Sequence, residues 1–456
     1  MGVVPVNASR RISIGDVEQA KGTANWFNLG YVWHPHDDRL LYIKQGEIWL
    51  MDLRGGHAGQ PQRLGSDLGK VVQSIHWFTR DGSAIIVGTD PVDDGTRVPI
   101  RPQSLALVPL DGAAPTKVEI DLDEKTWSYT GIVRADAVTV WQPDGHSVIL
   151  TLQEKATGEN ALVRFDLKTG RRKTLQKGYD QIGGEDSSLF ASNGSHRGLI
   201  GAFESYKQPL SIRSFSSELE KSTVLDIVDS AASQTAVGSV HFLSTDIPTY
   251  DGKLTAVRTA VLLPPGSKKG DKLPAIVMLY PGDDRSQSGK LFGGSSTGNS
   301  APNAVFTAAG FAVVLVDARV GPSNIAGDVV RDLTDSVLPQ VRKAAELGFI
   351  DINRVAVSGQ SGGGYASAAI ITRTNLFRAA ITVNGHYDLP GFNYARSGPS
   401  LDDTVLRLGS HPWQNILRYI DNSPYYQADK IQTPVMIVAG GADRSVEPDT
   451  RLFSRR

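Results

Sequence analysis

The segment "RVAVSGQSGGGYASAAI", residues 354–370, joins a short apolar run to a run of small residues through a serine flanked by glycines. Residues 359–363 fit the pattern G-x-S-x-G, in which a serine hydroxyl stands exposed on a sharp turn between a strand and a helix. Glycines on both sides let the two elements approach closely and tolerate a strained backbone. The pattern alone is weak in a chain with 47 glycines, but here a strand pattern precedes it and a helix pattern follows. We therefore predict that Ser361 is a nucleophile; an ordinary strand-to-helix turn is the alternative.

Around this segment, from about residue 240 onward, apolar strands alternate with helical patterns. Residues 329–348 predict a helix, because Leu333, Val337 and Val341 recur four apart on one face. Continuous apolar strands that alternate with helices indicate a parallel sheet covered on both faces. The strands are expected in "AVRTAVLLPP", "PAIVMLYPG", "FAVVLVDAR", "RVAVSG", "AAITVNG" and "PVMIVAGGAD". The sequence thus predicts an α/β catalytic domain over residues 236–456.

Residues 1–235 have a different pattern, in which short strands repeat with polar turns between them. Three repeats begin at Trp33, Trp77 and Trp141, and a weaker fourth copy lies near residues 192–216. Repeats of roughly 40–45 residues with two or more strands are typical of propeller blades, which bury their faces only by stacking. We predict a β-propeller-like domain with about four visible blades and the tryptophans wedged between them; an open sandwich is the alternative.

Composition limits the functions that need consideration. A chain of 456 residues is too long for one ordinary core, and a net charge of −1 gives no overall attraction to nucleic acid or to an anionic membrane. The absence of cysteine excludes disulfides, thiolate metal sites and a cysteine nucleophile. No apolar run approaches the roughly 18–20 residues of a membrane span. No signal peptide is recognisable, which favours the cytoplasm, although a truncated N-terminus would leave a periplasmic or secreted location open.

A serine hydroxyl needs a base, an oriented acid and donors for the oxyanion. Asp443 follows the strand expected at 434–439 and is the candidate acid; capping of a following helix is the alternative. The backbone N–H of Gly362 is one candidate oxyanion donor. The hydroxyl of Tyr280, which begins the loop after another strand, is the second, and an ordinary turn tyrosine is the alternative. Asp317 and Arg319 end a further strand, and we interpret them as a structural pair that holds loops.

The chain resembles the prolyl oligopeptidase family of serine peptidases. The similarity is carried by "YPG" at 280–282 and by the longer stretches "DARVGPSNIAGD", "ELGFIDINRVAVSGQSGGGYAS" and "NSPYYQADKIQTPVMIVAGGADRSV". The glutamyl-endopeptidase-like branch is the most similar. The resemblance implies a propeller plus an α/β-hydrolase domain, with Ser361 as nucleophile, Asp443 as acid, and Gly362 and Tyr280 as the oxyanion hole. It also implies short peptide substrates, with no metal and no cofactor.

One feature departs from the family: its catalytic histidine follows the acid, and no histidine follows Asp443 here. Only His386 and His411 come after the serine. His386 would require the order Ser, His, Asp, which this fold does not use, so we interpret it as a solvated or pocket-lining residue. We therefore expect a hydrolase domain that lacks its last elements, and a fragment that is nearly inactive. An esterase or acyl-peptide hydrolase, and a non-catalytic propeller scaffold, are the alternatives.

Overall fold

The structure is a computed structural model. The segments that it describes are residues 2–3, 12–13, 31–56, 58–66, 68, 71–92, 101–118, 127–135, 139–154, 157–182, 190–191, 198–234, 236–294, 303–321, 328–392, 407–409, 411–443, 450–451 and 453–454. No helix within them has the length and apolar character that crossing a bilayer requires.

The N-terminal half folds into four antiparallel sheets that follow one another along the chain. The first sheet contains β3 (Tyr31–Trp33), β4 (Arg39–Lys44), β5 (Glu47–Asp52) and β6 (Gln62–Leu64). The second contains β7 (Val71–Phe78), β8 (Ala84–Val92), β9 (Arg101–Pro109) and β10 (Thr116–Val118). The third contains β11 (Trp127–Ile132), β12 (Ser147–Glu154), β13 (Asn160–Asp166) and β14 (Arg172–Gly178). The fourth contains β15 (Gln181–Ile182), β16 (Phe190–Ala191), β17 (Gly198–Ser205), β18 (Gln208–Ser216) and β19 (Ser222–Ile227), and β1 (Gly2–Val3) pairs with β2 (Ile12–Ser13).

Each neighbouring pair of these sheets shares a buried apolar cluster. Trp141 lies in the cluster between the third and fourth sheets, where its indole N–H donates to the carbonyl of Ser217 at 2.9 Å. Trp77 packs at the edge of the cluster between the second and third sheets, below the guanidinium of Arg134. Trp33 is 41 % exposed, so the prediction of a wedging tryptophan is wrong there. Trp33 pairs with Leu40 on the face of the first sheet that points away from the second sheet, so it does not lie between the two.

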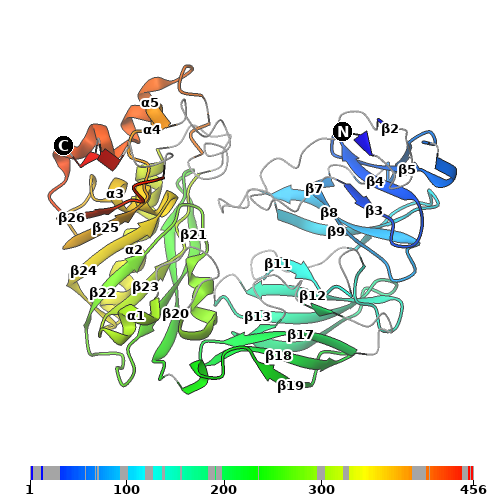
Figure 1. Ribbon diagram of the computed structural model, residues 1–456, viewed down its shortest axis with the longest axis horizontal. Helices are drawn as coiled ribbons and strands as arrows, with labels where there is room; N and C mark the ends of the chain where they lie inside the picture. Colours follow the sequence, from blue (N-terminus) through cyan, green and yellow to red (C-terminus); the bar gives the residue numbers. More distant parts are fainter. Residues whose placement is uncertain are drawn as a thin grey trace.

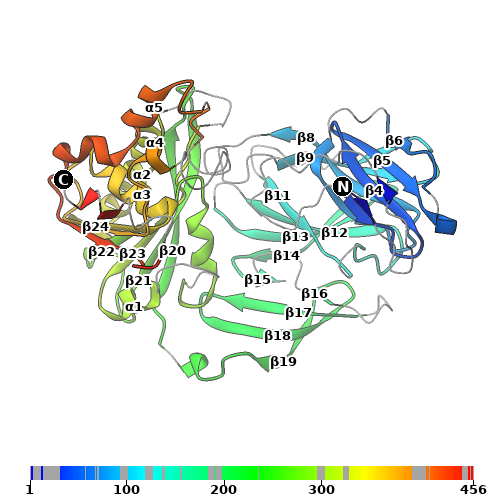
Figure 2. The same cartoon turned by 45° about the horizontal axis from the view of Figure 1, so that its top comes forward.

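The four sheets are arranged along an arc. In Figure 1 the fourth sheet lies beside the α/β half and the first sheet lies farthest from it, and the turned view in Figure 2 keeps the same order. Short 3-10 helices, η1 (Arg54–Gly56) and η2 (Ala232–Gln234), lie after β5 and after β19. The arrangement makes the fourth and third sheets the neighbours of the C-terminal half.

The C-terminal half is built on one seven-stranded sheet in the order β20-β21-β23-β22-β24-β25-β26. Strand β21 pairs antiparallel with both β20 and β23. From β23 to β26, neighbouring strands of the sheet pair in parallel. The strands are β20 (Ser239–Pro248), β21 (Leu254–Leu263), β22 (Leu273–Met278), β23 (Ala312–Val316), β24 (Ile350–Gln360), β25 (Ala379–Val383) and β26 (Val435–Val438). Among the described strands β26 forms the edge, and its Met436 is 61 % exposed.

Helices cover both faces of this sheet, which explains the continuous apolar strands. Along β21, Val261 faces the cluster beneath α2 (Val329–Glu346) and α3 (Gly362–Ile370), whereas Leu262 faces the opposite cluster with Tyr206. The apolar stripe predicted for α2 is buried, and the carboxylate of Asp328 caps its first turn by accepting from Arg331 N–H. Other helices of the described part of this half are α1 (Asn303–Ala308), α4 (Leu389–Phe392), α5 (Ile416–Asp421), η3 (Arg285–Lys290), η4 (Phe292–Gly294) and η7 (Pro424–Lys430).

Candidate active site

Ser361 lies at the bend between β24 and α3. Its backbone angles are φ 56° and ψ −119°, a conformation that a residue with a side chain rarely adopts. Two hydrogen bonds hold the bend: Ser361 N–H donates to the Val383 carbonyl at 2.8 Å, and Tyr365 N–H donates to the Ser361 carbonyl at 3.0 Å. The side chain is partly exposed, whereas the whole of α3 behind it is buried. The structure therefore gives Ser361 the strained turn that the sequence pattern predicts.

The glycines around Ser361 are required by close backbone packing. A Cβ on Gly359 would lie 2.5 Å from the carbonyl carbon and oxygen of Gly363. A Cβ on Gly363 would lie 2.5 Å from the carbonyl oxygen of Leu279. Both distances are shorter than atoms can approach, and in both cases the obstructing atom is backbone. Glycine at these two positions is thus what lets strand, turn and helix pack together.

The same packing brings the two candidate oxyanion donors to one place. Gly362 is the first residue of α3, whose unpaired N–H groups and positive dipole end favour negative charge. Tyr280 follows β22, and its ring would lie 3.4 Å from a Cβ on Gly363. The Tyr280 ring also packs at the edge of the main core, with the guanidinium of Arg285 5.3 Å from its centre. Gly362 and Tyr280 therefore flank the first turn of α3, next to Ser361.

Asp443 lies in the loop after β26, on the next strand but one from the serine. Its N–H donates to the Gly440 carbonyl at 3.0 Å, and Gly440 N–H in turn donates to the side-chain oxygen of Asn384 at 3.1 Å. This contact ties the Asp443 loop to the loop after β25. Asp443 thus lies in a turn closed by its own N–H on Gly440; the residues that would show whether it caps a following helix lie outside the described part of the chain.

His386 lies in the loop after β25, between the strands that carry Ser361 and Asp443. The side chain is buried, and burial lowers the pKa of His386 to about 4, while the nearby charge of Asp443 raises it. The imidazole is therefore neutral at pH 7 and within electrostatic reach of the candidate acid. His411 is placed elsewhere and stacks on the ring of Trp413, with centres 4.5 Å apart.

Asn384 contributes to the site and was missed by sequence reasoning. Its φ is 46°, its N–H donates to the Val438 carbonyl at 2.8 Å, and its side chain accepts from Gly440. The residue thereby connects β25 to β26 beside the loop that carries Asp443. An asparagine followed by glycine is a recognisable turn signal, and it is the clue that could have indicated this role.

Asp317 and Arg319 hold loops, but through other partners than predicted. The buried carboxylate of Asp317 accepts from Ser286 N–H at 2.8 Å and from the Ser286 hydroxyl at 3.0 Å. Arg319 forms its ion pair with Asp284. Burial is the main reason that the pKa of Asp317 rises, to about 6, and the neighbouring Asp284 adds to this effect.

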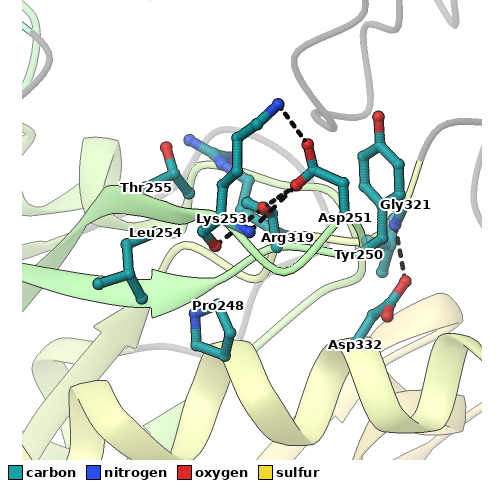
Figure 3. A pocket seen from close by; sticks show the side chains of 11 residues that line it. Pro248, Tyr250, Asp251, Lys253, Leu254, Thr255, Arg319, Gly321 and Asp332 are labelled. Atoms are coloured by element: carbon teal, nitrogen blue, oxygen red, sulfur yellow. Dashed lines mark hydrogen bonds and ion pairs between the residues drawn. The ribbon is translucent and has the colours of Figure 1, made fainter.

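A separate cavity of about 290 Å³ opens beside the β20–β21 hairpin. Figure 3 shows Lys253 paired with Asp251 on its rim and Asp332 accepting from Gly321 N–H. The lining residues are Pro248, Thr249, Tyr250, Asp251, Lys253, Leu254, Thr255, Arg319, Val320, Gly321 and Asp332. None of these belongs to the loops that carry Ser361, His386 or Asp443, so the cavity is not the candidate active site.

Comparison with known proteins identifies the family. The sequence model of the prolyl oligopeptidase family matches residues 299–453, a segment that includes Ser361, His386 and Asp443. The chain carries a prolyl oligopeptidase family domain. The resemblance predicted from the sequence is confirmed by this match, and the solved structures that share the fold are peptidases.

Curated relatives match the domain over part of their length. The chain is 26 % identical over 217 residues to a probable chloroplastic glutamyl endopeptidase of Oryza sativa subsp. japonica, a match covering 43 % of this chain and 21 % of that protein. It is 32 % identical over 133 residues to the prolyl endopeptidase FAP of Bos taurus, covering 27 % and 17 %. The chain thus spans about a fifth of the length of these relatives.

Solved structures show the same fold across the chain. A putative dipeptidyl aminopeptidase IV from Bacteroides ovatus superimposes with a TM-score of 0.66 at 16 % identity, covering 93 % of this chain and 60 % of that one. The acylaminoacyl peptidase of Pyrococcus horikoshii superimposes with a TM-score of 0.61 at 16 % identity, covering 93 % and 63 %. The coverage extends beyond the catalytic part to the N-terminal sheets.

Proposed function

We propose that this chain is a serine peptidase that cleaves short peptides through an acyl-enzyme on Ser361. The observation that carries the proposal is the strained turn at Ser361, packed through two obligatory glycines against the first turn of α3 and the Tyr280 loop. A turn of this kind leaves the serine side chain at the surface beside groups that can bind negative charge. Membership in a peptidase family favours a peptide bond as the target.

In the proposed reaction the Ser361 oxygen attacks the carbonyl carbon of the scissile bond. The developing oxyanion accepts hydrogen bonds from Gly362 N–H and the Tyr280 hydroxyl. A base takes the serine proton and gives it to the leaving amine, which leaves an ester on Ser361. Water then attacks the ester, the base takes a proton from that water, and the serine is restored. Asp443 orients the base.

We propose further that attack by Ser361 is slow where His386 is the base. His411 stacks on Trp413. His386 is buried with a pKa of about 4, so it binds a proton weakly at neutral pH. Slow attack follows from a base this weak, while the oxyanion donors still contribute.

The test is covalent labelling of the purified chain with a fluorophosphonate, with the adduct mapped by mass spectrometry. We expect a slow adduct on Ser361, no adduct in Ser361→Ala, and faster labelling when free imidazole supplies the base. Fast labelling without imidazole that is lost in His386→Ala, but kept in His411→Ala, would assign the base to His386 and overturn the proposal of slow attack. Absence of any adduct on Ser361 with imidazole present would overturn the peptidase proposal.

A further inference from the structure

The third N-terminal sheet contacts η3 of the α/β half through a small polar network. Gln153 on β12 and Gln287 on η3 exchange two hydrogen bonds, each amide donating to the other's oxygen at 2.8 Å. Next to them the Lys290 ammonium donates to the side-chain oxygen of Asn160 on β13 at 2.7 Å. Gln153 also donates to that oxygen at 3.3 Å. Four side chains from two halves of the molecule thus form one connected set.

Because the network is buried, it favours one position of the third sheet against η3. The side chains of Gln153 and Lys290 are both almost fully buried. A buried amide or ammonium that loses its partner costs about 1–3 kcal/mol, because water cannot replace the lost bond. The Arg258 side chain packs against the turn between β12 and β13, where a Cβ on Gly158 would lie 2.7 Å from the Arg258 Cδ. The sheet and η3 can therefore shift relative to each other only by breaking several bonds at once.

The network is continuous with the loop that carries Tyr280. Ser286, the residue before Gln287, is fixed to Asp317 by its N–H and its hydroxyl. Arg285 lies over the Tyr280 ring. Nearer to the tyrosine, Gly282 N–H donates to the Ala318 carbonyl at 2.7 Å. The segment from Tyr280 to η3 is thus tied to the residues after β23 at Gly282 and Ser286, and Arg285 contacts the Tyr280 ring.

We infer that the third sheet positions the oxyanion loop: Gln153, through Gln287 and η3, holds Tyr280 where its hydroxyl meets the reacting carbonyl. The inference rests on the proposed function, since it assumes that Tyr280 is an oxyanion donor. Gln153 and Gln287 are positioning residues, because neither lies in the Ser361, His386 or Asp443 loops. The N-terminal half is then part of the catalytic apparatus as well as a neighbouring structure.

Hydrogen exchange measured by mass spectrometry on the full chain decides the inference without requiring activity. In Gln153→Ala we expect amides of residues 279–290 to exchange about tenfold faster, the effect of losing about 1.4 kcal/mol of local stability. Thr130→Ala is the matched control, since Thr130 bonds to Thr151 in the same sheet and should leave this segment unchanged. Unchanged exchange at 279–290 in Gln153→Ala, or equal acceleration in every segment of the chain, would overturn the inference.

A double-mutant cycle distinguishes coupling between Gln153 and Gln287 from a general loss of stability. Gln153→Ala and Gln287→Ala each remove the same pair of hydrogen bonds, so the double variant should accelerate exchange at 279–290 by less than the product of the two single effects. Independent effects would argue against coupling. Fluorophosphonate labelling with imidazole separates this inference from the proposed function. If Tyr280→Phe labels as fast as wild type, the oxyanion role fails even where the exchange coupling is present.

Discussion

Strands β23 and β24 both end in polar residues at the same edge of the sheet, but these residues are held in opposite ways. After β24, Ser361 is held by its own backbone and by glycines close in sequence. After β23, Asp317 is held by the side chain and N–H of Ser286, which lies 31 positions earlier in the chain. The serine turn stores strain and presents a group to solvent, whereas the aspartate is fully buried and connects loops. A local sequence motif supplies the glycines of the first arrangement, which Val383 and Leu279 complete from distant positions. The second arrangement is made by long-range contacts alone.

Of the substitutions that test this contrast, Gly359→Ala should lower the free energy of unfolding most. The added methyl group overlaps the Gly363 backbone, and backbone cannot move aside without distorting the turn. We expect a loss of about 4 kcal/mol in the free energy of unfolding, measured by urea denaturation. The control is Gly441→Ala, where no atom lies within 4 Å of the added Cβ. Equal stability of the two variants would show that glycine is dispensable at the bend.

Asp317→Ala should have the next largest effect. The substitution leaves Ser286 and the nearby Arg258 without the buried carboxylate that they face, and breaking a buried ion pair costs about 3 kcal/mol. Asp351→Ala is the control, because that acid pairs with the half-exposed Arg354 at the surface and should lose only about 0.5 kcal/mol. If Asp317→Ala lowers the free energy of unfolding no more than Asp351→Ala does, Asp317 has no structural role.

The two regions should also respond to pH with opposite signs. The folded-state pKa of Asp317 is raised to about 6, so the stability that its protonation contributes is present below pH 4 and is lost as the pH rises through 6. The folded-state pKa of His386 is lowered to about 4, so its contribution is present above pH 6.5 and is lost as the pH falls through 4. In the wild type the two effects oppose each other between pH 4 and 6.

Single variants should separate these contributions in urea unfolding measured at a series of pH values. In His386→Gln the free energy of unfolding should fall by about 2–3 kcal/mol from pH 4 to pH 6, and in Asp317→Asn it should rise by a similar amount. Parallel pH profiles for the two variants would contradict the assignment of either shift.

The smallest expected effect lies at the serine itself. Ser361 has a positive φ, which costs a residue with a Cβ about 1 kcal/mol and costs glycine almost nothing. Ser361→Gly should therefore be about 1 kcal/mol more stable than Ser361→Ala by thermal unfolding, although both remove the proposed nucleophile. If the two variants unfold at the same temperature, the turn relaxes once the hydroxyl is gone.

Much of the fold could be predicted because its signals are local. The period of α2, the apolar strands and the G-x-S-x-G turn all appear in short windows of sequence. Trp33 could not be predicted in the same way: it matches Trp141 in the repeat, but its exposure depends on which sheets lie beside it. Asn384 was missed for a related reason, since its partner Gly440 lies 56 positions away.

The sequence by itself determined the α/β sheet, the bend at Ser361 and the resemblance of residues 299–453 to the prolyl oligopeptidase family. Backbone sterics and apolar periodicity act over a few residues, so short windows of sequence carry these signals. Only the tertiary structure placed His386 within reach of Asp443 and paired Gln153 with Gln287 across 134 positions. A buried polar group takes whichever partner the packed chain brings to it, and that choice depends on how distant segments meet.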